Sequence, residues 1–371
     1  MSMRGTDVTT SSPDQLSPNA VDSTERIGAD RLRGFTRQVF EKCGMPPVDA
    51  EILTDHLVWA ELRGLSWLGA NKIPEYVARL RAGVTSATGR DPEVHFQRGG
   101  FLVVDAEDTF GHVVGYRVMK QVIETARSTG VSAAVIRNTT SAGALGYYVS
   151  LAVEENMIGL AINNGPPLQP APGGAEKVIG NQAFAVGSPA GQHPPLVLDM
   201  ATSSMSLVRI HDYQRRGEHL PEGVALTADG DPTIDPVAAL DGMLLPMGGH
   251  RGFGLALLWE VLTGVLAAST TFSTDVGWPG DTSRPQGVSM LLLVVDPTVS
   301  MPYETFAARM DDLVDRIHRS RRAAGADEIR LPGERAARTM TERRTDGIPL
   351  QSALLTRLRA IAAELGVPTS V

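Results

Sequence analysis

Four glycines surround a histidine–arginine pair in the stretch Gly248-Gly249-His250-Arg251-Gly252-Phe253-Gly254. An apolar run, Leu255 to Ala267, follows directly and predicts a helix that begins at or near the glycines. Glycine lets a backbone come close to a ligand, and the first N–H groups of a helix can bind an anion. Arg251 adds a forked, permanently charged donor that suits phosphate. The stretch therefore predicts a loop that binds the phosphates of a cofactor.

A tight turn with one solvated arginine would also explain these residues, and the stretch alone leaves that alternative open. The pattern is neither Gly-x-Gly-x-x-Gly after an N-terminal strand nor a P-loop, because no Gly-Lys-Ser/Thr follows the glycines. Within the apolar run, one helical face is expected to be buried. It contains Leu257, Leu258, Val261, Leu262 and Val265.

Composition narrows the class of protein. The 371 residues include 34 basic and 42 acidic side chains, and the net charge of −8 argues against a nucleic-acid partner, which needs a basic face. The single cysteine, Cys43, excludes an intrachain disulfide and a cysteine-built metal site, and no metal site is predicted. No apolar run is long enough to span a membrane, and no signal peptide pattern begins the chain. The sequence thus predicts a cytoplasmic protein with no membrane partner.

Strands and helices alternate along the chain, which indicates α/β layers. Residues 1–24 are polar and are expected to form a disordered tail. Hydrophobic spacing predicts helices over residues 29–42, 47–62, 74–81, 113–127, 304–323 and 350–365, and from the loop 138–148 to about 156. It predicts strands within residues 93–105 and over 131–136, 158–162, 183–186, 196–198 and 288–295. The segment Asp199-Met200-Ala201-Thr202-Ser203 is expected to lead into a helix that ends near Arg215.

Several further motifs occur in a fixed order: Tyr76-Val77-x-Arg79-Leu80-x-x-Gly83, Asp199 to Ser203, Leu220-Pro221-Glu222-Gly223, the glycine stretch, and Leu331-Pro332-Gly333-Glu334-Arg335. Together they resemble the malate/L-lactate dehydrogenase family, which also includes sulfolactate and ureidoglycolate dehydrogenases and reductases of piperideine- and pyrroline-2-carboxylate. The resemblance implies an α/β, non-Rossmann fold with a mixed central sheet and helices from both chain ends packed together. It also implies a homodimer that transfers hydride between a nicotinamide cofactor and a small-molecule 2-oxo, 2-hydroxy or 2-imino acid.

The resemblance also implies how the chain is divided into domains. Residues 25–110 would form the N-terminal helical part of a substrate domain, 111–300 the cofactor-binding α/β domain, and 301–371 C-terminal helices that pack with the N-terminal part. NADH or NADPH would bind to residues drawn from four loops. These are Ser141, Gly143, Asn163, Asn164, Gly174, Thr202, Ser203, Gly249, His250, Arg251, Gly252 and Gly254.

The catalytic positions depart from the family pattern. In Arg-Gly-x-x-Ser-His-Gly the family's serine and its proton-donating histidine are replaced by Trp67 and Leu68, and a second family histidine is replaced by Ser141. Lys72 replaces a substrate-side arginine. Leucine cannot donate a proton, so the acid that carbonyl reduction needs is missing.

The remaining candidates carry alternative interpretations. Tyr76, Lys72 and Asp199 are the candidate catalytic residues, and Tyr147 joins Trp67, Leu68 and Ser141 as a candidate for the substrate pocket. Asp199 has lost its family partner, and a helix N-cap before Ala201 is the competing interpretation. None of the eight histidines obviously replaces the lost acid: His56 is expected on a surface or in a core, and His112 near a helix start.

Three functions remain in order of preference. The first is an NAD(P)H-dependent reductase of a C=N bond in a cyclic imine or iminium, in a specialised or biosynthetic pathway. It is preferred because a protonated imine already carries its proton. The second is a non-redox cyclase or isomerase, or a cofactor-binding scaffold. The third is a 2-oxo/2-hydroxy acid dehydrogenase with a displaced acid.

Overall fold

The computed structural model describes residues 23–87, 93–269, 272–368 and 371, so residues 1–22 of the predicted tail lie outside it. Strand β1 (Thr24–Ile27) pairs antiparallel with β12 (Ile348–Gln351), close to the other end of the sequence. Thr24, which the sequence places in the tail, therefore lies in a strand.

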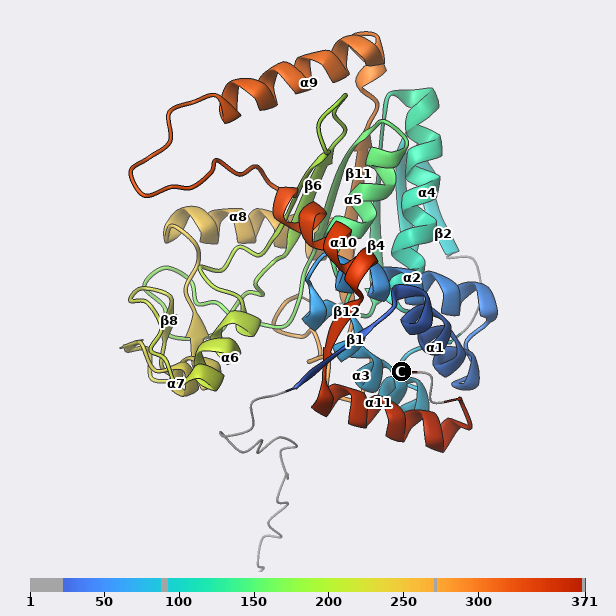
Figure 1. The fold of residues 1–371 in the computed structure, drawn as a ribbon, viewed down its shortest axis with the longest axis vertical. Coiled ribbons are helices and arrows are strands. Elements are labelled where there is room, and N and C mark those ends of the chain that lie inside the picture. Colours follow the sequence, from blue (N-terminus) through green and yellow to red (C-terminus); the bar gives the residue numbers. More distant parts are fainter. Residues whose placement is uncertain (1–22, 88–92, 270–271, 369–370) are drawn as a thin grey trace, which may run out of the picture.

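A seven-stranded mixed sheet forms the centre of the molecule (Figure 1). Its strands, in spatial order, are β2 (Glu93–Arg98), β3 (Phe101–Asp105), β4 (Val131–Thr139), β11 (Val288–Val295), β5 (Ile158–Asn163), β6 (Phe184–Ser188) and β7 (Leu196–Met200). Only β3 and β4 pair in parallel, and all other neighbours are antiparallel. The expected mixed sheet is thereby confirmed.

Helices cover both faces of this sheet. Helices α4 (Gly111–Thr129) and α5 (Leu145–Glu154) pack on one face with a continuous apolar core. Helix α8 (His250–Glu260), which continues as a π-helical turn (Val261–Val265), packs on the other. Strand β11 is buried between them and has no polar face, because a strand covered on both sides needs apolar residues throughout.

The register of the sheet brings several strand ends to one edge. Val288 at the start of β11 pairs with Thr139 at the end of β4, and Met290 pairs with Asn163 at the end of β5. Phe184, at the start of β6, pairs with Met200, at the end of β7. The loops that leave β4, β5 and β7 therefore start at the same edge, and they carry most of the residues singled out from the sequence.

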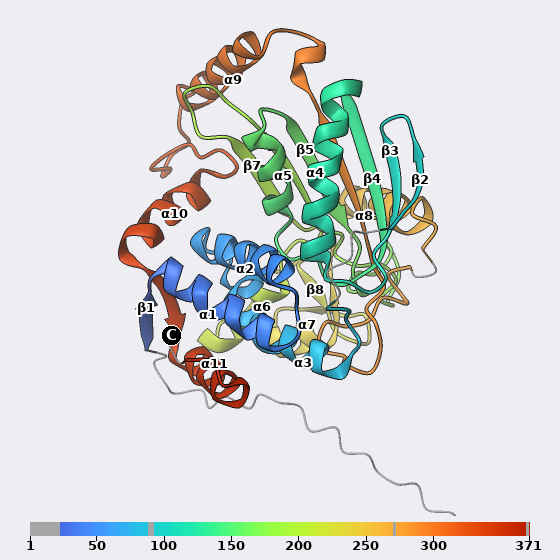
Figure 2. The same ribbon diagram turned by 90° about the vertical axis from the view of Figure 1, so that its right-hand side faces the viewer.

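Segments from both chain ends pack together beside this edge (Figure 2). They comprise α1 (Ala29–Lys42), α2 (Pro47–Leu62), α3 (Ile73–Ala82), α10 (Glu334–Asp346) and α11 (Ser352–Leu365). One apolar cluster joins α1, α2, α3, α11 and the β1–β12 ribbon. The expectation that helices from both ends pack together is confirmed for α10 and α11.

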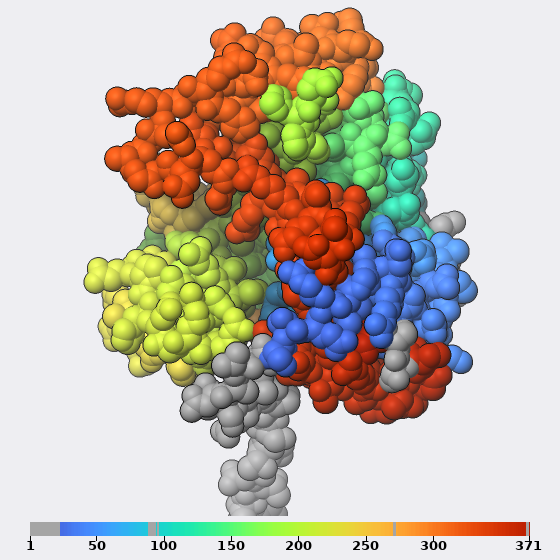
Figure 3. Space-filling view, viewed as in Figure 1, coloured from blue at the N-terminus to red at the C-terminus, as the bar shows by residue number. Residues whose placement is uncertain are grey.

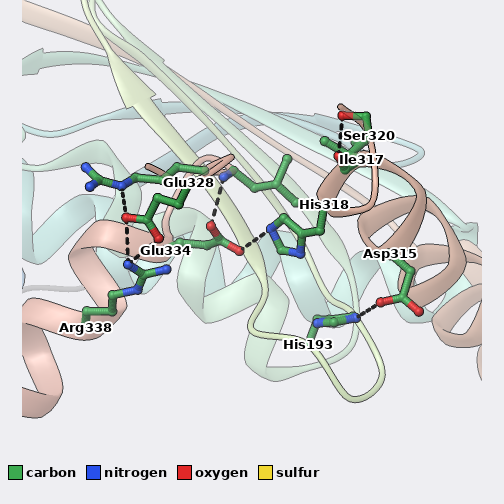
Figure 4. Close-up of polar contacts among 10 residues, drawn as sticks. His193, Asp315, Ile317, His318, Ser320, Glu328, Glu334 and Arg338 are labelled. Atoms are coloured by element: carbon green, nitrogen blue, oxygen red, sulfur yellow. Dashed lines mark hydrogen bonds and ion pairs between the residues drawn. The ribbon is translucent and has the colours of Figure 1, made fainter. Parts of the chain in front are cut away.

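Helix α9 (Tyr303–His318) lies apart from the other C-terminal helices, at the far end of the sheet (Figure 1). Asp311 accepts hydrogen bonds from the backbone N–H groups of Gly191, Gln192 and His193 in the turn between β6 and β7. The rings of His193 and His318 pair with Asp315 and Glu334, respectively, as Figure 4 shows. Polar contacts thus hold α9 to the sheet.

Besides the central sheet and the segments from both chain ends, a third part of the molecule, here called the third lobe, lies beside α8. It contains a small sheet of β8 (Ala225–Leu226), β9 (Pro232–Thr233) and β10 (Met243–Leu244), together with α6 (Leu207–Arg216) and α7 (Pro236–Asp241). In the space-filling view the surface is hollowed between this lobe and the N-terminal helices (Figure 3). No helix among the described residues is long and apolar enough to cross a bilayer.

The structure differs from the sequence expectations at three elements. The helix expected to end near Arg215 is present as α6, but it begins only at Leu207, where Ser206 caps it, and Asp199 belongs to strand β7. Helix α10 was not predicted, because its sequence is strongly charged and has no buried face. Most of the face of α8 expected to be buried is exposed instead: Leu257, Leu258, Val261 and Val265 face solvent in the single chain, and of the five predicted residues Leu262 packs on the sheet. The packed face also contains Leu255, Ala256, Trp259 and Ala267.

Candidate active site

The loop after α2 is organised by one buried carboxylate. Glu61 accepts hydrogen bonds from the Ala70 N–H (2.9 Å) and the Ser66 hydroxyl (2.8 Å), and burial raises the pKa of its carboxyl. Arg343 of α10 donates to the backbone carbonyl of Glu61. A Cβ at Gly69 would lie 2.6 Å from the Glu61 side chain, so only glycine allows the loop to close over it. This bracing fixes the loop that carries Trp67, Leu68 and Lys72.

Two of these loop residues face the third lobe. Trp67 is 46% exposed and its ring lies 6.0 Å from that of His211 on α6. The ammonium of Lys72 lies 5.8 Å from the Trp67 ring and pairs with Glu75 at 2.8 Å. Lys72 therefore has a fixed counter-ion, which opposes its predicted use as a proton donor. Leu68 is half-buried at the end of the same turn.

The loop from β4 to α5 is held at nearly every residue. The Thr140 hydroxyl accepts from the Gly111 N–H, and the Ser141 N–H donates to Gln286 Oε1 at 3.0 Å. Gly143 adopts a positive φ of 66°, which glycine reaches without strain. The Tyr148 hydroxyl donates to the carbonyl of Ala142 at 2.8 Å. These contacts fix the loop, and with it the positions of the half-exposed Ser141 and of the first N–H groups of α5.

Asp199 meets this loop from β7. Its Oδ2 accepts a hydrogen bond from the Gly146 N–H at 2.7 Å, at the N-terminus of α5, where the helix dipole favours a negative charge. The side chain reaches solvent, yet the atoms packed around it still desolvate the carboxyl. Burial raises its pKa to about 6, against the lowering effects of Gly146 and Arg63. The alternative that Asp199 caps a helix before Ala201 is wrong, since no helix begins there.

Two tyrosines from the sequence analysis are buried. The Tyr147 hydroxyl donates to Asp55 at 2.8 Å, and burial first, then Asp55, raises its pKa. Tyr76 lies under the loop with its Oη 3.4 Å from His112 Nε2, and burial raises its pKa well above the usual range. Both phenols are neutral groups inside the protein. The Tyr147 hydroxyl is already hydrogen-bonded to Asp55. This placement gives no support to the prediction that Tyr147 lines the substrate pocket.

Unpaired polar atoms gather where β5 ends and β11 begins. Asn164 is buried; its Oδ1 accepts from the Ser289 N–H at 2.8 Å, while its Nδ2 has no partner among the described residues. The same holds for Asn163 Oδ1 and Ser289 Oγ. Buried polar atoms normally find partners, so this group indicates a place for a ligand or for water. Gly174, in contrast, lies in an exposed turn of the following loop.

Thr202 links the strand β7 loop to the glycine stretch. Its hydroxyl donates to the Asn181 carbonyl and accepts from Gln169, and its own carbonyl accepts from the Met247 N–H at 2.8 Å. The Ser203 hydroxyl donates to the Met205 carbonyl. Both side chains are therefore used inside the protein, where they hold the turn before α8.

The glycine stretch itself is open to solvent. Gly248 and Gly249 have positive φ angles of 60° and 64°, and α8 begins at the next residue, His250. His250 and Arg251 are exposed, and the Arg251 guanidinium lies over Gly248. Gly252 fits directly against the Met247 carbonyl, where a Cβ would lie at 2.2 Å, whereas a Cβ at Gly254 would meet nothing. The helix start thus presents free N–H groups beside an unengaged cation, an arrangement suited to an anion.

Sequence reasoning missed four residues that build this region. His56 and His112 lie directly behind Gly143, Gln286 holds Ser141, and the buried Arg79 donates to the carbonyls of Pro279 and Asp281 in the segment that carries Gln286. Arg79 belongs to the motif Tyr76-Val77-x-Arg79-Leu80-x-x-Gly83, and that motif could have pointed to it. The two histidines lie 56 positions apart and the contact that unites them is tertiary, so no local pattern could have found it.

The chain matches known proteins over nearly its whole length. Residues 27–359 match the family model described as malate/L-lactate dehydrogenase. A malate dehydrogenase of Pyrococcus abyssi (strain GE5 / Orsay) is 34% identical over 352 residues, which cover 92% of this chain and 95% of that protein.

Solved structures agree with the sequence matches. The sulfolactate dehydrogenase from Methanocaldococcus jannaschii superposes with a TM-score of 0.88 at 32% identity, covering 93% of this chain and 98% of that one. The delta1-piperideine-2-carboxylate reductase from Pseudomonas syringae pvar. tomato superposes with a TM-score of 0.82 at 29% identity, covering 91% and 100%. Fold, loops and matches together show that this chain belongs to the malate/L-lactate dehydrogenase family of oxidoreductases.

Proposed function

We propose that the protein is an NAD(P)H-dependent reductase of a C=N bond in a cyclic imine or iminium. The observation that carries the proposal is the state of Asp199. Its carboxylate has no imidazole beside it, its one hydrogen bond among the described residues comes from the Gly146 N–H, and its pKa of about 6 leaves it anionic at neutral pH. The charge of Arg63 acts on Asp199, but no ion pair among the described residues holds the carboxylate. A solvent-reaching anion of this kind suits a substrate that arrives as a cation.

The chemistry of an iminium fits this site. When hydride adds to the iminium carbon, the C=N π electrons move to nitrogen and a neutral amine forms without a proton transfer in that step. The loss of an acid at positions 68 and 141 then costs little. We propose that Asp199 pairs with the N–H⁺ of the iminium, keeps the nitrogen protonated and holds it beside α5. Trp67 and Leu68 would supply an apolar wall for the ring.

The residues present fit a nicotinamide cofactor, which when reduced supplies the hydride. The start of α8, with His250 and Arg251, would bind its phosphates, and Gly249 and Gly254 would allow close approach. Gly252 would act by letting the helix start pack against the Met247 backbone. The unpaired Asn163 Oδ1 and Asn164 Nδ2 would gain partners from it, and Ser141 and Gly143 would border the same edge of the sheet. Thr202 and Ser203 would contribute by holding the turn before α8 in place. Gly174 lies in an exposed turn and would contact the cofactor only from the solvent side. The choice between NADH and NADPH stays open.

A panel of substrates tests this function. Purified protein is mixed with NADH or NADPH and either cyclic 2-imino acids of five- and six-membered rings or 2-oxo acids, and absorbance loss of the reduced nicotinamide is followed. We expect turnover of the imines to exceed that of the oxo acids. Faster turnover of the oxo acids would overturn the proposal and favour the second candidate, a 2-oxo/2-hydroxy acid dehydrogenase with a displaced acid, whose support is that malate and sulfolactate dehydrogenases are among the relatives.

Removal of the Arg251 guanidinium is expected to weaken cofactor binding. Arg251→Ala loses a charge-assisted contact to phosphate, which is worth about 1–3 kcal/mol, or roughly 5- to 150-fold in Kd. Calorimetry with NADH and NADPH measures the change. Arg357→Ala removes an equally exposed arginine from α11 and serves as the matched control. Equal cofactor affinities of the two variants and the wild type would show that Arg251 only faces solvent.

We further propose that the chain works as a homodimer in the cytoplasm and that the exposed face of α8 lies in the dimer interface. Leu257, Leu258, Val261, Val265 and Leu266 form a continuous apolar surface with exposed fractions from 42% to 61%. Apolar surface of this kind is favourable to bury. Leu258→Asp is expected to shift the mass measured by light scattering from dimer to monomer at micromolar concentration. Leu313→Asp on α9, with 47% exposure, is the control that should leave the mass unchanged.

A further inference from the structure

Two histidines form a buried pair behind the loop that joins β4 to α5. His56 comes from the middle of α2 and His112 from the first turn of α4, and both are fully buried. Their ring centroids lie 4.5 Å apart, with the rings nearly perpendicular at 76°. The proposed chemistry of the site uses neither of them.

The pair supports the loop directly. The Ala144 N–H donates to His56 Nε2 at 2.9 Å, just before the first residue of α5. A Cβ on Gly143 would lie 2.5 Å from His112 Nε2 and 2.7 Å from His56 Nε2. The two rings therefore fill the space behind Gly143, and the loop can neither retreat into the protein nor carry a side chain there.

His112 also reaches the front of the loop through Tyr76. Its Nε2 lies 3.4 Å from Tyr76 Oη, and the Ser141 side chain lies close enough to Tyr76 to lower its pKa against the larger effect of burial. Burial, and the charge of Lys72 to a lesser degree, lowers the pKa of His112 to about 3, so its ring is neutral at physiological pH. A neutral imidazole can hold the Tyr76 hydroxyl in one orientation, which in turn orients the Ser141 hydroxyl.

Burying the two histidine rings costs free energy, and tight packing alone does not explain why they are there. Nδ1 of each histidine is buried without a hydrogen-bond partner among the described residues. An apolar side chain of similar volume would avoid that cost at position 112. Buried unpaired atoms in contact with a loop at the candidate site indicate that the rings are kept for what they do to the loop.

We propose that His56 and His112 are positioning residues: they hold residues 141–144 so that the Ser141 hydroxyl and the N-terminus of α5, with Asp199 on its Gly146 N–H, face the substrate in one fixed geometry. The inference rests on the proposed function only in taking this loop to face the substrate. His56 acts as an acceptor for the loop backbone, and His112 acts through Tyr76. Neither ring touches the reacting atoms.

His112→Leu separates this role from a merely structural one. The substitution removes the unpaired Nδ1, so the midpoint of urea unfolding is expected to stay or rise. The loop loses its support through Tyr76, and kcat for the preferred substrate is expected to fall about 10- to 100-fold while the cofactor Kd changes less than twofold. His193→Gln, in the distant turn between β6 and β7, should change neither kcat nor the cofactor Kd. Parallel losses of kcat and stability, or an unchanged kcat, would overturn the proposal for His112.

Conservative rescue tests His56. In His56→Gln, the amide Oε1 can take the place of Nε2 as the acceptor for the Ala144 N–H, whereas His56→Leu offers no acceptor. We expect the Leu variant to lose kcat and the Gln variant to regain at least half of it. Equal activity of the two variants would overturn the role of the hydrogen bond.

The same variants decide the inference when the substrate class proves different. If wild-type protein reduces oxo acids and not imines, the proposed function fails, and kcat on the oxo acid is compared instead. If neither class is turned over, the affinity for pyrrole-2-carboxylate, a planar ring acid, is measured by calorimetry with reduced cofactor present. Weaker binding by His112→Leu and His56→Leu at unchanged cofactor affinity supports the positioning role, and unchanged or absent binding in all proteins overturns it.

Discussion

Asp199→Asn is expected to lower kcat/KM for a cyclic imine about 100- to 1,000-fold, the range found when one preorganised electrostatic group is removed from an active site. The amide oxygen can still accept the Gly146 N–H, so the N-terminus of α5 stays capped and the fold should be unchanged. What is lost is the negative charge that we propose to pair with the iminium. Steady-state kinetics and cofactor calorimetry, run on the same preparations, separate this loss from weaker cofactor binding.

The pH profile gives the same prediction a second readout. Since the pKa of Asp199 is raised to about 6, the wild-type rate should rise with pH as the carboxyl ionises across that value, and the variant should lack this limb. Glu154→Gln is the matched control, because Glu154 lies at the C-terminal end of α5, also interacts with Arg63 and also has a raised pKa. An Asp199→Asn enzyme as active as the control would refute the pairing of Asp199 with a cationic substrate.

Acid is expected to destabilise the fold through the histidine pair. In the folded protein the pKa of His112 is about 3, against about 6.5 when it is solvated, and burial lowers that of His56 in the same direction. The unfolded chain therefore binds more protons between these two values. The stability contributed by the neutral ring of His112 is fully present above pH 6.5 and is lost as the pH falls toward 3, at about 1.4 kcal/mol per pH unit. His56 adds a loss in the same direction.

Urea unfolding at pH 7, 6, 5 and 4 measures this slope. Asp199 acts in the opposite direction between about pH 6 and its ordinary pKa, because its folded-state pKa is raised, so the total slope mixes both signs. The double variant His56→Gln/His112→Gln isolates the histidine part, since glutamine does not titrate and leaves every carboxylate in place. Its free energy of unfolding should fall less steeply with acid than that of the wild type. Identical slopes would mean that the rings are protonated in the folded protein.

The sequence by itself determined the main elements and the family. Helices α1 and α2 and strand β11 begin and end where hydrophobic spacing places them, because each buries a regular apolar pattern against the core. The ordered motifs also identified the family, and with it the non-Rossmann sheet. Local chemistry further located the start of α8, since four glycines followed by an apolar run leave few other conformations.

Tertiary structure decided the contents of the site. Asp199 was sequentially adjacent to a predicted helix, yet it serves the N-terminus of α5, because the register of β6 and β7 brings it there. The apolar face of α8 was expected to be buried, but hydrophobicity does not say which of two apolar faces meets the sheet, and the smaller Ala256 and Ala267 lie on the packed one. No local sequence pattern indicates that His56 and His112 lie together. Their joint environment exists only once α2, α4 and the loop of Gly143 have packed together, and that packing sets their protonation and the geometry of the loop they support.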